Sequence, residues 1–427
     1  MKYRVSAGRI ALLMVCSAVV AILGVNLFAA SDRSIRQAFP HTYSVADAQF
    51  DRTMGVMLGP PLVPGNKVDT LLNGDQIFPA MLSAIRGAKK TITFETYIYW
   101  SGTIGKEFAD ALSARARDGV KVHVMVDWVG SQKMDAALLD EMKEAGVELR
   151  KYHPLAWYTL DKLNNRTHRK LLVVDGRVGF TGGVGIADEW SGHAQDPDHW
   201  RDTHYRIEGP AVAQMQAAFI DNWSQVSGVI LNGPEYFPRI DDAGPQMAQL
   251  FHSSDEGGSE STHLMYLLSI AAATKSIDLS MAYFVPDQLA MDALLDAIKR
   301  GVRVRIVVPG SHTDASLVRR ASRALWGPLL RAGGEIFEYQ PTMFHCKVLV
   351  VDGLWTSVGS TNFDNRSFRL NDEANLNIRD AAFAARQVAD FEADLKHSRR
   401  VTLEEWSGRP ASEKAWEHFI ALFGAQL

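Results

Sequence analysis

The chain has 427 residues, of which 47% are hydrophobic and 22% are charged, and its formal net charge is −4. This length and composition predict a globular protein of two ordinary domains, or one large domain built from two halves. A nonspecific nucleic-acid binder usually carries a surplus of basic residues, so the mild negative charge disfavours a nuclease. The two cysteines, Cys16 and Cys346, exclude a disulfide framework and a zinc site of the usual ligand spacing.

In chain order, the first predicted element is a transmembrane helix. Residues 10–30 contain no charged side chain, and about 20 apolar residues suffice to cross a bilayer. Lys2, Arg4 and Arg9 precede this segment, so the positive-inside rule predicts that residues 1–9 are cytoplasmic and that the remaining chain lies outside the cytoplasm. A cleaved signal peptide is the alternative, but its apolar core usually has only about 7–15 residues. We therefore expect an uncleaved, single-pass anchor.

Residues 31–67 are weakly patterned and rich in Pro and Gly towards their end, which predicts a linker. After this linker, strand-like and helix-like segments alternate. Such alternation predicts a sheet that is covered by helices on both faces. The predicted elements of the first half are a helix at 76–88, a strand at 91–99, a helix at 105–118, a strand at 120–127, a helix at 136–145 and a strand at 147–152.

The same order of elements returns in the second half of the chain. Lys90-Thr-Ile-Thr-Phe reappears as Lys275-Ser-Ile-Asp-Leu, for example. Because the repeating unit is much longer than a solenoid repeat, we interpret it as an internal duplication of a whole domain. The predicted units are a first repeat at 68–231, a joint at 232–244, a second repeat at 245–405 and a C-terminal helical segment at 406–427.

Each half carries one copy of the pattern His-x-Lys-x-x-x-x-Asp around a predicted strand. Side chains alternate between the two faces of a strand, so the histidine and the lysine point the same way. An imidazole beside an ammonium makes a poor core but a good anion site. A lone histidine on a strand is usually structural, and the repeated spacing favours a catalytic role. The motif residues are His168, Lys170 and Asp175 in the first half, and His345, Lys347 and Asp352 in the second.

The doubled pattern, with Gly-Ser-Thr-Asn at 359–362 after its second copy, resembles the signature of the phospholipase D superfamily. Two copies behind an N-terminal apolar segment are most similar to bacterial cardiolipin synthases. The resemblance spans roughly residues 66–405. It implies an α/β fold of two pseudo-twofold-related phospholipase D-like repeats, each a mixed β-sheet flanked by helices, behind the transmembrane helix. It also implies a bacterial inner-membrane protein whose catalytic body lies on the periplasmic side.

Phosphodiester transfer needs a nucleophile, a proton donor for the leaving alcohol, and positive groups around the phosphoryl oxygens. The resemblance implies that His168 is the nucleophile, which forms a phosphohistidine, and that His345 is the proton donor. Two histidines fill both roles without a metal or another cofactor, so we expect neither. The residues expected to hold the phosphoryl oxygens are Lys170, Lys347, Ser360 and Asn362.

Each histidine also needs a carboxylate that fixes its tautomer and favours its cationic form. The resemblance places this partner downstream of each motif, where the sequence offers Asp202 after His168 and Glu373 after His345. The aspartates of the motifs themselves each end a strand just before a glycine. We interpret Asp175 and Asp352 as turn residues more than as catalysts, although they belong to the catalytic signature.

The first half departs from the signature at Gly182-Gly183-Val184-Gly185, where Gly185 takes the place of the asparagine. We expect the backbone N–H groups around Gly183 to bind a phosphoryl oxygen instead. The first half also has an additional aromatic and basic loop at 155–167, just before its motif. This loop is interpreted either as a lipid interface or as a loop that packs on its own domain.

The expected reaction is phosphatidyl transfer between two phosphatidylglycerol molecules, which gives cardiolipin and glycerol. The expected partners are phosphatidylglycerol, other membrane phospholipids and the membrane, with no nucleic acid. Hydrolysis of phospholipid to phosphatidic acid by the same site is the first alternative. A membrane-anchored nuclease or phosphodiesterase is the second, and a non-enzymatic scaffold with a decayed site is the third.

Overall fold

The structure is a computed structural model that describes residues 8, 13, 14, 17, 35, 37–154, 165–254 and 260–424. The predicted transmembrane segment 10–30, apart from residues 13, 14 and 17, therefore lies outside the described residues. Most of the loop at 155–167 lies outside them as well. Across the part of the chain that is described, no helix combines the length and the apolar character that crossing a membrane requires.

The secondary structure of the first half alternates between strands and helices. It comprises α2 (Ala48–Leu58), β1 (Val63–Leu72), α3 (Asn73–Gly87), β2 (Thr91–Thr96), α4 (Thr103–Arg117), β3 (Lys121–Asp127), α5 (Ala136–Glu144), β4 (Glu148–Tyr152), β5 (Arg166–Thr167), β6 (Leu171–Val174), β7 (Val178–Gly182), the 3₁₀ helix η2 (Asp188–Trp190), β8 (Thr203–Glu208) and α6 (Ala211–Ser227). All six elements expected between residues 76 and 152 are present, with shifted ends.

The second half follows the same plan. It comprises β9 (Gln246–His252), α7 (Ser261–Ala272), β10 (Ser276–Met281), β11 (Phe284–Val285), α8 (Gln288–Lys299), β12 (Arg303–Pro309), α9 (Ser316–Ala332), β13 (Glu335–Tyr339), β14 (Lys347–Val351), β15 (Trp355–Gly359), β16 (Phe363–Asp364), α10 (Asn365–Arg369), β17 (Asn371–Asp372), β18 (Ala374–Arg379), α11 (Ala381–Leu395), β19 (Ser398–Val401), α12 (Leu403–Ser407) and α13 (Ala411–Ala421).

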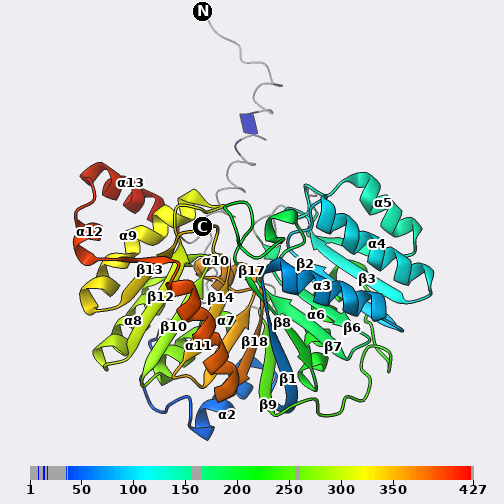
Figure 1. Ribbon diagram of the computed structural model, residues 1–427, viewed down its shortest axis with the longest axis horizontal. Coiled ribbons are helices and arrows are strands. Elements are labelled where there is room, and N and C mark those ends of the chain that lie inside the picture. The colour runs from blue at the N-terminus through cyan, green and yellow to red at the C-terminus, as the bar shows by residue number, and fades with distance from the viewer. Residues whose placement is uncertain are drawn as a thin grey trace, which may run out of the picture.

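One mixed sheet of 15 strands runs through both halves (Figure 1). From the centre outwards, the first half contributes β1, β8, β7, β6, β2, β3 and β4, and the second contributes β9, β18, β15, β14, β10, β12 and β13, with β19 added at the edge. Equivalent strands therefore occupy equivalent places on both sides of the central antiparallel pair β1–β9. This order is that of two repeats related by a pseudo-twofold axis, as expected, although their strands join into a single sheet.

The predicted linker at 31–67 is wrong over its second part, because α2 and the start of β1 lie there. Phe50 of α2 is fully buried and packs edge-on against Trp355 of the second half, with ring centroids 4.8 Å apart. Strand β1 pairs with β8 on one side and β9 on the other. Its Pro64 and Gly65 argued against a strand, but they fall at an irregularity between the β9 pairings of Val63 and Asn66.

Candidate active site

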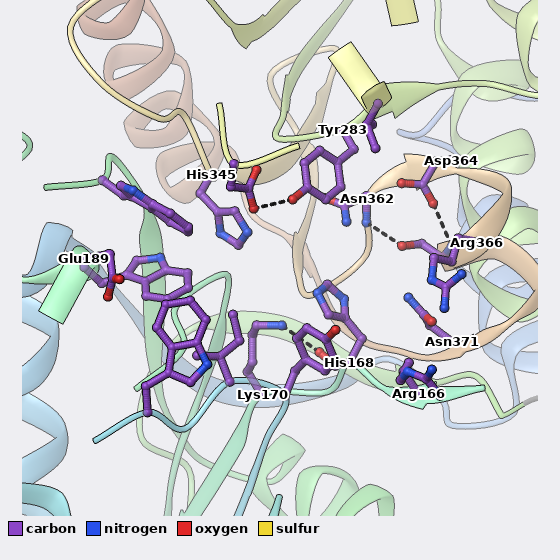
Figure 2. A pocket seen from close by; sticks show the side chains of 18 of the residues that line it. Arg166, His168, Lys170, Glu189, Tyr283, His345, Asn362, Asp364, Arg366 and Asn371 are labelled. Carbon is purple, nitrogen blue, oxygen red and sulfur yellow. Dashed lines mark hydrogen bonds between the residues drawn. The ribbon is translucent and has the colours of Figure 1, made fainter. Parts of the chain in front are cut away.

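The two halves together line a cavity of about 690 Å³ (Figure 2). Both motif histidines point into it, and each half contributes part of the wall. Of the predicted site residues, His168, Lys170, His345 and Asn362 line the cavity. The other lining residues are Tyr97, Ile98, Trp100, Lys133, Arg166, Glu189, Trp190, Trp200, Tyr283, Asp314, Val318, Asp364, Arg366, Ser367 and Asn371.

Each motif histidine is hydrogen-bonded to a carboxylate of the other half. His168 Nδ1 lies 2.9 Å from Glu373 Oε1 and 3.0 Å from Oε2. His345 Nδ1 lies 2.7 Å from Asp202 Oδ2. The sequence predicts both carboxylates as tautomer-fixing groups. However, the predicted pairing of Asp202 with His168 and of Glu373 with His345 is wrong. Asp202 serves His345, and Glu373 serves His168.

Two short parallel pairings between the halves produce this exchange. In the first, β5 pairs with β17, and the backbone N–H of His168 donates to the carbonyl of Asp372, 2.9 Å away. Glu373 is the next residue along, so it arrives beside the His168 ring. In the second, Arg201 bridges to Phe344, and the N–H of His345 donates to the carbonyl of Arg201 at 2.8 Å. Asp202 likewise follows directly.

In the pair of His168 and Glu373, the histidine is neutral and its Nε2 is free of a proton. Burial would raise the pKa of Glu373, but its interaction with His168, the charge of Lys170 and the hydrogen bond from Ser360 hold it below its ordinary value. Because the carboxylate is ionised, His168 Nδ1 carries the proton and donates it to Glu373. Burial lowers the pKa of His168 to about 4, against the opposing effect of Glu373. Its Nε2 therefore presents a lone pair.

The second pair is held by more contacts around its carboxylate. Asp202 also accepts hydrogen bonds from Trp190 Nε1 at 2.9 Å and from the backbone N–H of Thr203 at 2.8 Å. Burial would raise the pKa of Asp202, but His345 and Lys347 bring it below its ordinary value. Burial and the charge of Lys347 lower the pKa of His345, and Asp202 opposes them. A phosphate anion in the cavity would favour the imidazolium.

The motif lysines lie beneath the histidines and bind their backbones. Lys170 Nζ donates to the carbonyl of His168 at 2.9 Å, and Lys347 Nζ donates to the carbonyl of His345 at 2.8 Å. Lys347 Nζ is also 3.2 Å from both ring nitrogens of His345. Burial lowers the pKa of Lys170 to about 7 and also lowers that of Lys347. Lys170 lines the cavity, so an anion bound there would stabilise its charge. Lys347 does not line the cavity and lies against the His345 ring.

Ser360 and Gly183 have a different role from the expected one. Ser360 donates its hydroxyl hydrogen to Glu373, and the N–H of Gly183 already donates to the carbonyl of Thr203 at 3.1 Å. Neither residue lines the cavity. A Cβ on Gly183 would lie 2.2 Å from Asp202 Oδ1, so this glycine makes room for the carboxylate. Both residues therefore support the carboxylates instead of holding phosphoryl oxygens.

Asn362 and Gly185 make the site asymmetric, as the sequence indicated. Asn362 is 3% exposed, lines the cavity, and its Oδ1 has no hydrogen-bond partner among the described residues. A side chain at Gly185 would collide with Ile98, because its Cβ would lie 2.8 Å from the Ile98 Cβ. The first half therefore has no space for a second asparagine, and the amide comes from the second half alone.

Asp175 and Asp352 lie at the far ends of their motif strands, away from the histidines. Asp175 accepts backbone N–H groups of residues 89–91 at the start of β2, and Asp352 accepts those of residues 274–276 at the start of β10. Both have a positive φ, 53° and 54°. These contacts hold the motif strands in register with β2 and β10. They agree with the interpretation of Asp175 and Asp352 as turn residues.

Sequence reasoning missed the aromatic and charged groups of the cavity wall. Trp190 and Trp200 approach the His345 ring with centroid distances of 5.3 and 5.6 Å, and Tyr97 approaches the His168 ring at 5.3 Å. Glu189 and Arg366 were also missed. They stand at the same offset from their motif histidines, so a comparison of the two repeats residue by residue would have found them.

Comparisons with known proteins place these motifs in context. The model of the family described as cardiolipin synthase, phospholipase D-like domain, matches residues 81–223 and 266–395. Cardiolipin synthase 1 of Bacillus cereus is 34% identical over 379 residues, which cover 86% of this chain and 74% of that protein. Cardiolipin synthase A of Pseudomonas syringae is 35% identical over 357 residues, 83% of this chain and 74% of that protein.

Among solved structures, the chain is similar to a phosphatidylserine synthase of Haemophilus influenzae. The TM-score is 0.68 at 15% identity, with 89% of this chain and all of that chain covered. A polyphosphate kinase of Porphyromonas gingivalis is more distant, with a TM-score of 0.50 at 13% identity over 77% of this chain and 50% of that chain. At such identities the likeness concerns the fold alone.

Proposed function

Since the chain belongs to the phospholipase D-like cardiolipin synthase family, we propose that it transfers a phosphatidyl group from one phosphatidylglycerol to another. The products are cardiolipin and glycerol. The observation that carries this proposal is the pair of imidazoles from two halves on one cavity, each held through Nδ1 by a carboxylate. Such a pair supplies one nucleophile and one proton carrier, which are the two groups that transesterification of a phosphodiester needs.

The first half-reaction forms a covalent intermediate. His168 Nε2 attacks the phosphorus of the donor lipid, and a P–N bond replaces the P–O bond to glycerol. His345, protonated on Nε2, gives that proton to the departing oxygen. Lys170, Lys347 and the amide of Asn362 stabilise the charge that builds on the phosphoryl oxygens. Donors that are fixed before the reaction contribute most to this stabilisation, and both lysines are already held by backbone carbonyls.

The second half-reaction returns the enzyme to its starting state. A glycerol hydroxyl of the acceptor phosphatidylglycerol gives its proton to His345 Nε2 and attacks phosphorus. The P–N bond to His168 breaks, and cardiolipin leaves. The same site would make phosphatidic acid with water as the acceptor, so transfer depends on how well the lipid acceptor competes with water.

The substrates are bilayer lipids, and the proposal therefore includes a membrane location. We propose that residues 10–30 anchor the protein in a bacterial inner membrane with the catalytic body on the outer side, as the preceding Lys2, Arg4 and Arg9 predict. A reporter that is active only in the periplasm, fused after Leu427, is expected to be active. Activity of a cytoplasm-only reporter at the same position would overturn the orientation.

The reaction itself is tested with purified full-length protein and vesicles of phosphatidylglycerol. Mass spectrometry is expected to find cardiolipin and glycerol in equal amounts, and neither with His168→Ala or His345→Ala. Phosphatidic acid alone would make the chain a hydrolase. Cleavage of DNA or of a soluble diester by the wild-type protein, without any lipid product, would sink the proposal.

A further inference from the structure

The two ends of the cavity are chemically unlike, although repeats build them. Glu189 of the first half stands where Arg366 stands in the second. Arg366 lies beside Asn371 and Arg166, which face each other in the β5–β17 pairing. Figure 2 shows these three residues together at one end of the cavity, with Glu189 at the other. Asp364 also lies at the Arg366 end, where the two guanidinium groups outnumber its one carboxylate. The pseudo-twofold axis therefore relates an end with a surplus of positive charge, the cationic end, to an end that carries Glu189.

The end with Glu189 adjoins His345. Trp190 and Trp200, which follow Glu189 along the chain, both approach the His345 ring. The backbone carbonyl of Glu189 accepts the N–H of Trp200 at 2.7 Å and so ties these residues together. The cationic end adjoins His168 instead, because Arg166 precedes it by two residues. Each end thus belongs to one histidine.

Three carboxylates of the described residues line the cavity, and two of them have protein partners: Asp314 accepts from the Tyr283 hydroxyl, and Asp364 accepts from the N–H of Ser367. Glu189 is the third. Its half-buried carboxylate lines the cavity and makes no hydrogen bond or ion pair within the described residues. A carboxylate only accepts hydrogen bonds, and it repels a nearby phosphate. Hydroxyl groups are neutral donors that it can bind in such a place. Indole rings beside it offer apolar faces for the carbons that carry those hydroxyls.

Lys133 lies near this end through Trp100, whose backbone N–H donates to the carbonyl of Ile186, three residues before Glu189. It lines the cavity, and its Nζ lies 3.7 Å from the centroid of the Trp100 ring. This ammonium occupies an aromatic face that a cationic headgroup such as choline or ethanolamine would otherwise use. The end therefore combines an acceptor for hydroxyl groups with the positive charge of an exposed lysine, which suits a polyol that is itself attached to a phosphate.

We propose that Glu189, with Trp190 and Trp200, forms the subsite for the glycerol headgroup, and that Lys133 binds the phosphodiester of the acceptor lipid. This proposal deepens the proposed function and rests on it. The group that leaves and the group that enters both exchange a proton with His345, so both lie at this end. Glu189 accepts a hydrogen bond from the glycerol hydroxyl that does not react, and thereby selects glycerol over alcohols that lack it.

The role of Glu189 is tested by headgroup exchange, which needs no acceptor phosphate. Phosphatidylglycerol vesicles are incubated with equal amounts of deuterated glycerol and 1-propanol, and the two phosphatidyl alcohols are counted by mass spectrometry. The wild-type enzyme is expected to prefer glycerol, and Glu189→Gln to lose about 10- to 100-fold of that preference, the worth of a hydrogen bond to a charged group. Glu107→Gln, at an exposed position of α4, is the matched control.

The Lys133→Met variant tests binding of the acceptor phosphodiester separately from binding of the glycerol headgroup. It is expected to raise the KM for phosphatidylglycerol as acceptor and to lower cardiolipin formation, while exchange with deuterated glycerol keeps its wild-type rate. Lys396→Met, at an exposed site on α11's end, is the control.

The proposal is overturned if Glu189→Gln keeps the wild-type preference for glycerol, or if Lys133→Met slows both reactions equally. Each variant is also assayed for total glycerol released from the donor lipid. A variant that still releases glycerol forms the intermediate and is therefore folded. A wild-type enzyme that makes no cardiolipin but exchanges glycerol would refute the proposed function and leave the Glu189 subsite standing.

Discussion

Asp202 of the first half binds the histidine of the second: its Oδ2 lies 2.7 Å from His345 Nδ1, although 143 residues separate the two in the chain. The reciprocal pair joins Glu373 to His168. Neither half therefore holds a complete catalytic pair. Each half-site contains an imidazole from one repeat and its orienting anion from the other, which makes the assembly of the two halves a condition for activity.

This exchange predicts different defects for the two carboxylates. In Asp202→Asn, the anion that favours protonated His345 is lost, so transfer from phosphatidylglycerol is expected to fall by about 10²- to 10⁴-fold, the usual worth of general acid catalysis. A phosphatidyl p-nitrophenol donor, whose leaving group needs no proton, is expected to restore intermediate formation. Glu373→Gln acts on His168 and is expected to slow both donors alike. The reverse pattern in stopped-flow release of nitrophenol would show that the carboxylates serve the other histidines.

The proposed roles of the histidines predict where a covalent adduct forms. With the same nitrophenyl donor, His345→Ala is expected to accumulate a phosphatidyl adduct on His168, because attack needs no acid and the second half-reaction lacks its base. His168→Ala is expected to form none. Peptide mass mapping after acid-free quenching locates the adduct. An adduct on His345 in the His168→Ala protein, with none on His168 in the other, would invert the roles.

The pKa shifts predict a bell-shaped pH profile for the free enzyme. As the pH falls through about 4, His168 gains a proton on Nε2 and ceases to be a nucleophile. As the pH rises, His345 loses the proton that it gives to the leaving group, because burial and Lys347 lower its pKa, and through about 7 Lys170 loses the charge that neutralises the phosphoryl oxygens. The rate at low substrate is thus expected to decline on both sides. Lys170→Arg keeps its charge at high pH, so the alkaline limb is expected to become less steep; an unchanged limb would assign it to His345 alone.

The close approach of Gly183 to Asp202 predicts that a larger residue at position 183 lowers the stability of the fold. In Gly183→Ala, the added Cβ would lie 2.2 Å from Asp202 Oδ1, and this carboxylate is already held by His345, Trp190 and Thr203. The expected cost is about 1–3 kcal/mol in the free energy of unfolding, as for other overpacked sites. Urea unfolding measures it. Gly87→Ala, where a Cβ meets nothing within 4 Å, is the control that should not destabilise. Equal midpoints for all three proteins would contradict the expectation.

A mechanism with two histidines predicts that activity survives chelation. The described residues contain no group of three or more His, Cys, Asp or Glu side chains arranged to hold a metal ion. The wild-type enzyme, dialysed against EDTA, is expected to keep its rate on phosphatidylglycerol in mixed vesicles with a neutral lipid, which limits the effect of cations on the lipid surface. Complete loss of turnover that a single divalent ion restores would refute a metal-free reaction.

Local signals in the sequence were sufficient for much of the fold. The alternation of helices and strands from residue 76 to 152 was predictable because each element has its own apolar period. The region at 48–72 was not, since α2 and β1 are stabilised by partners far along the chain. Phe50 packs on Trp355, and β1 pairs with β8 and β9. A short helix and a strand with Pro and Gly carry no such information locally.

For the site, the sequence by itself determined the two His-Lys pairs, because the duplication repeats their spacing. The resemblance to the family signature supplied the single Asn362 and the two carboxylates, which stand at different distances from their motif histidines. Only the tertiary structure decided which carboxylate binds which histidine. The reason is that β5 pairs with β17 and Arg201 with Phe344, and both pairings cross between the halves. Spacing along one chain cannot reveal a contact that two distant segments make through their backbones.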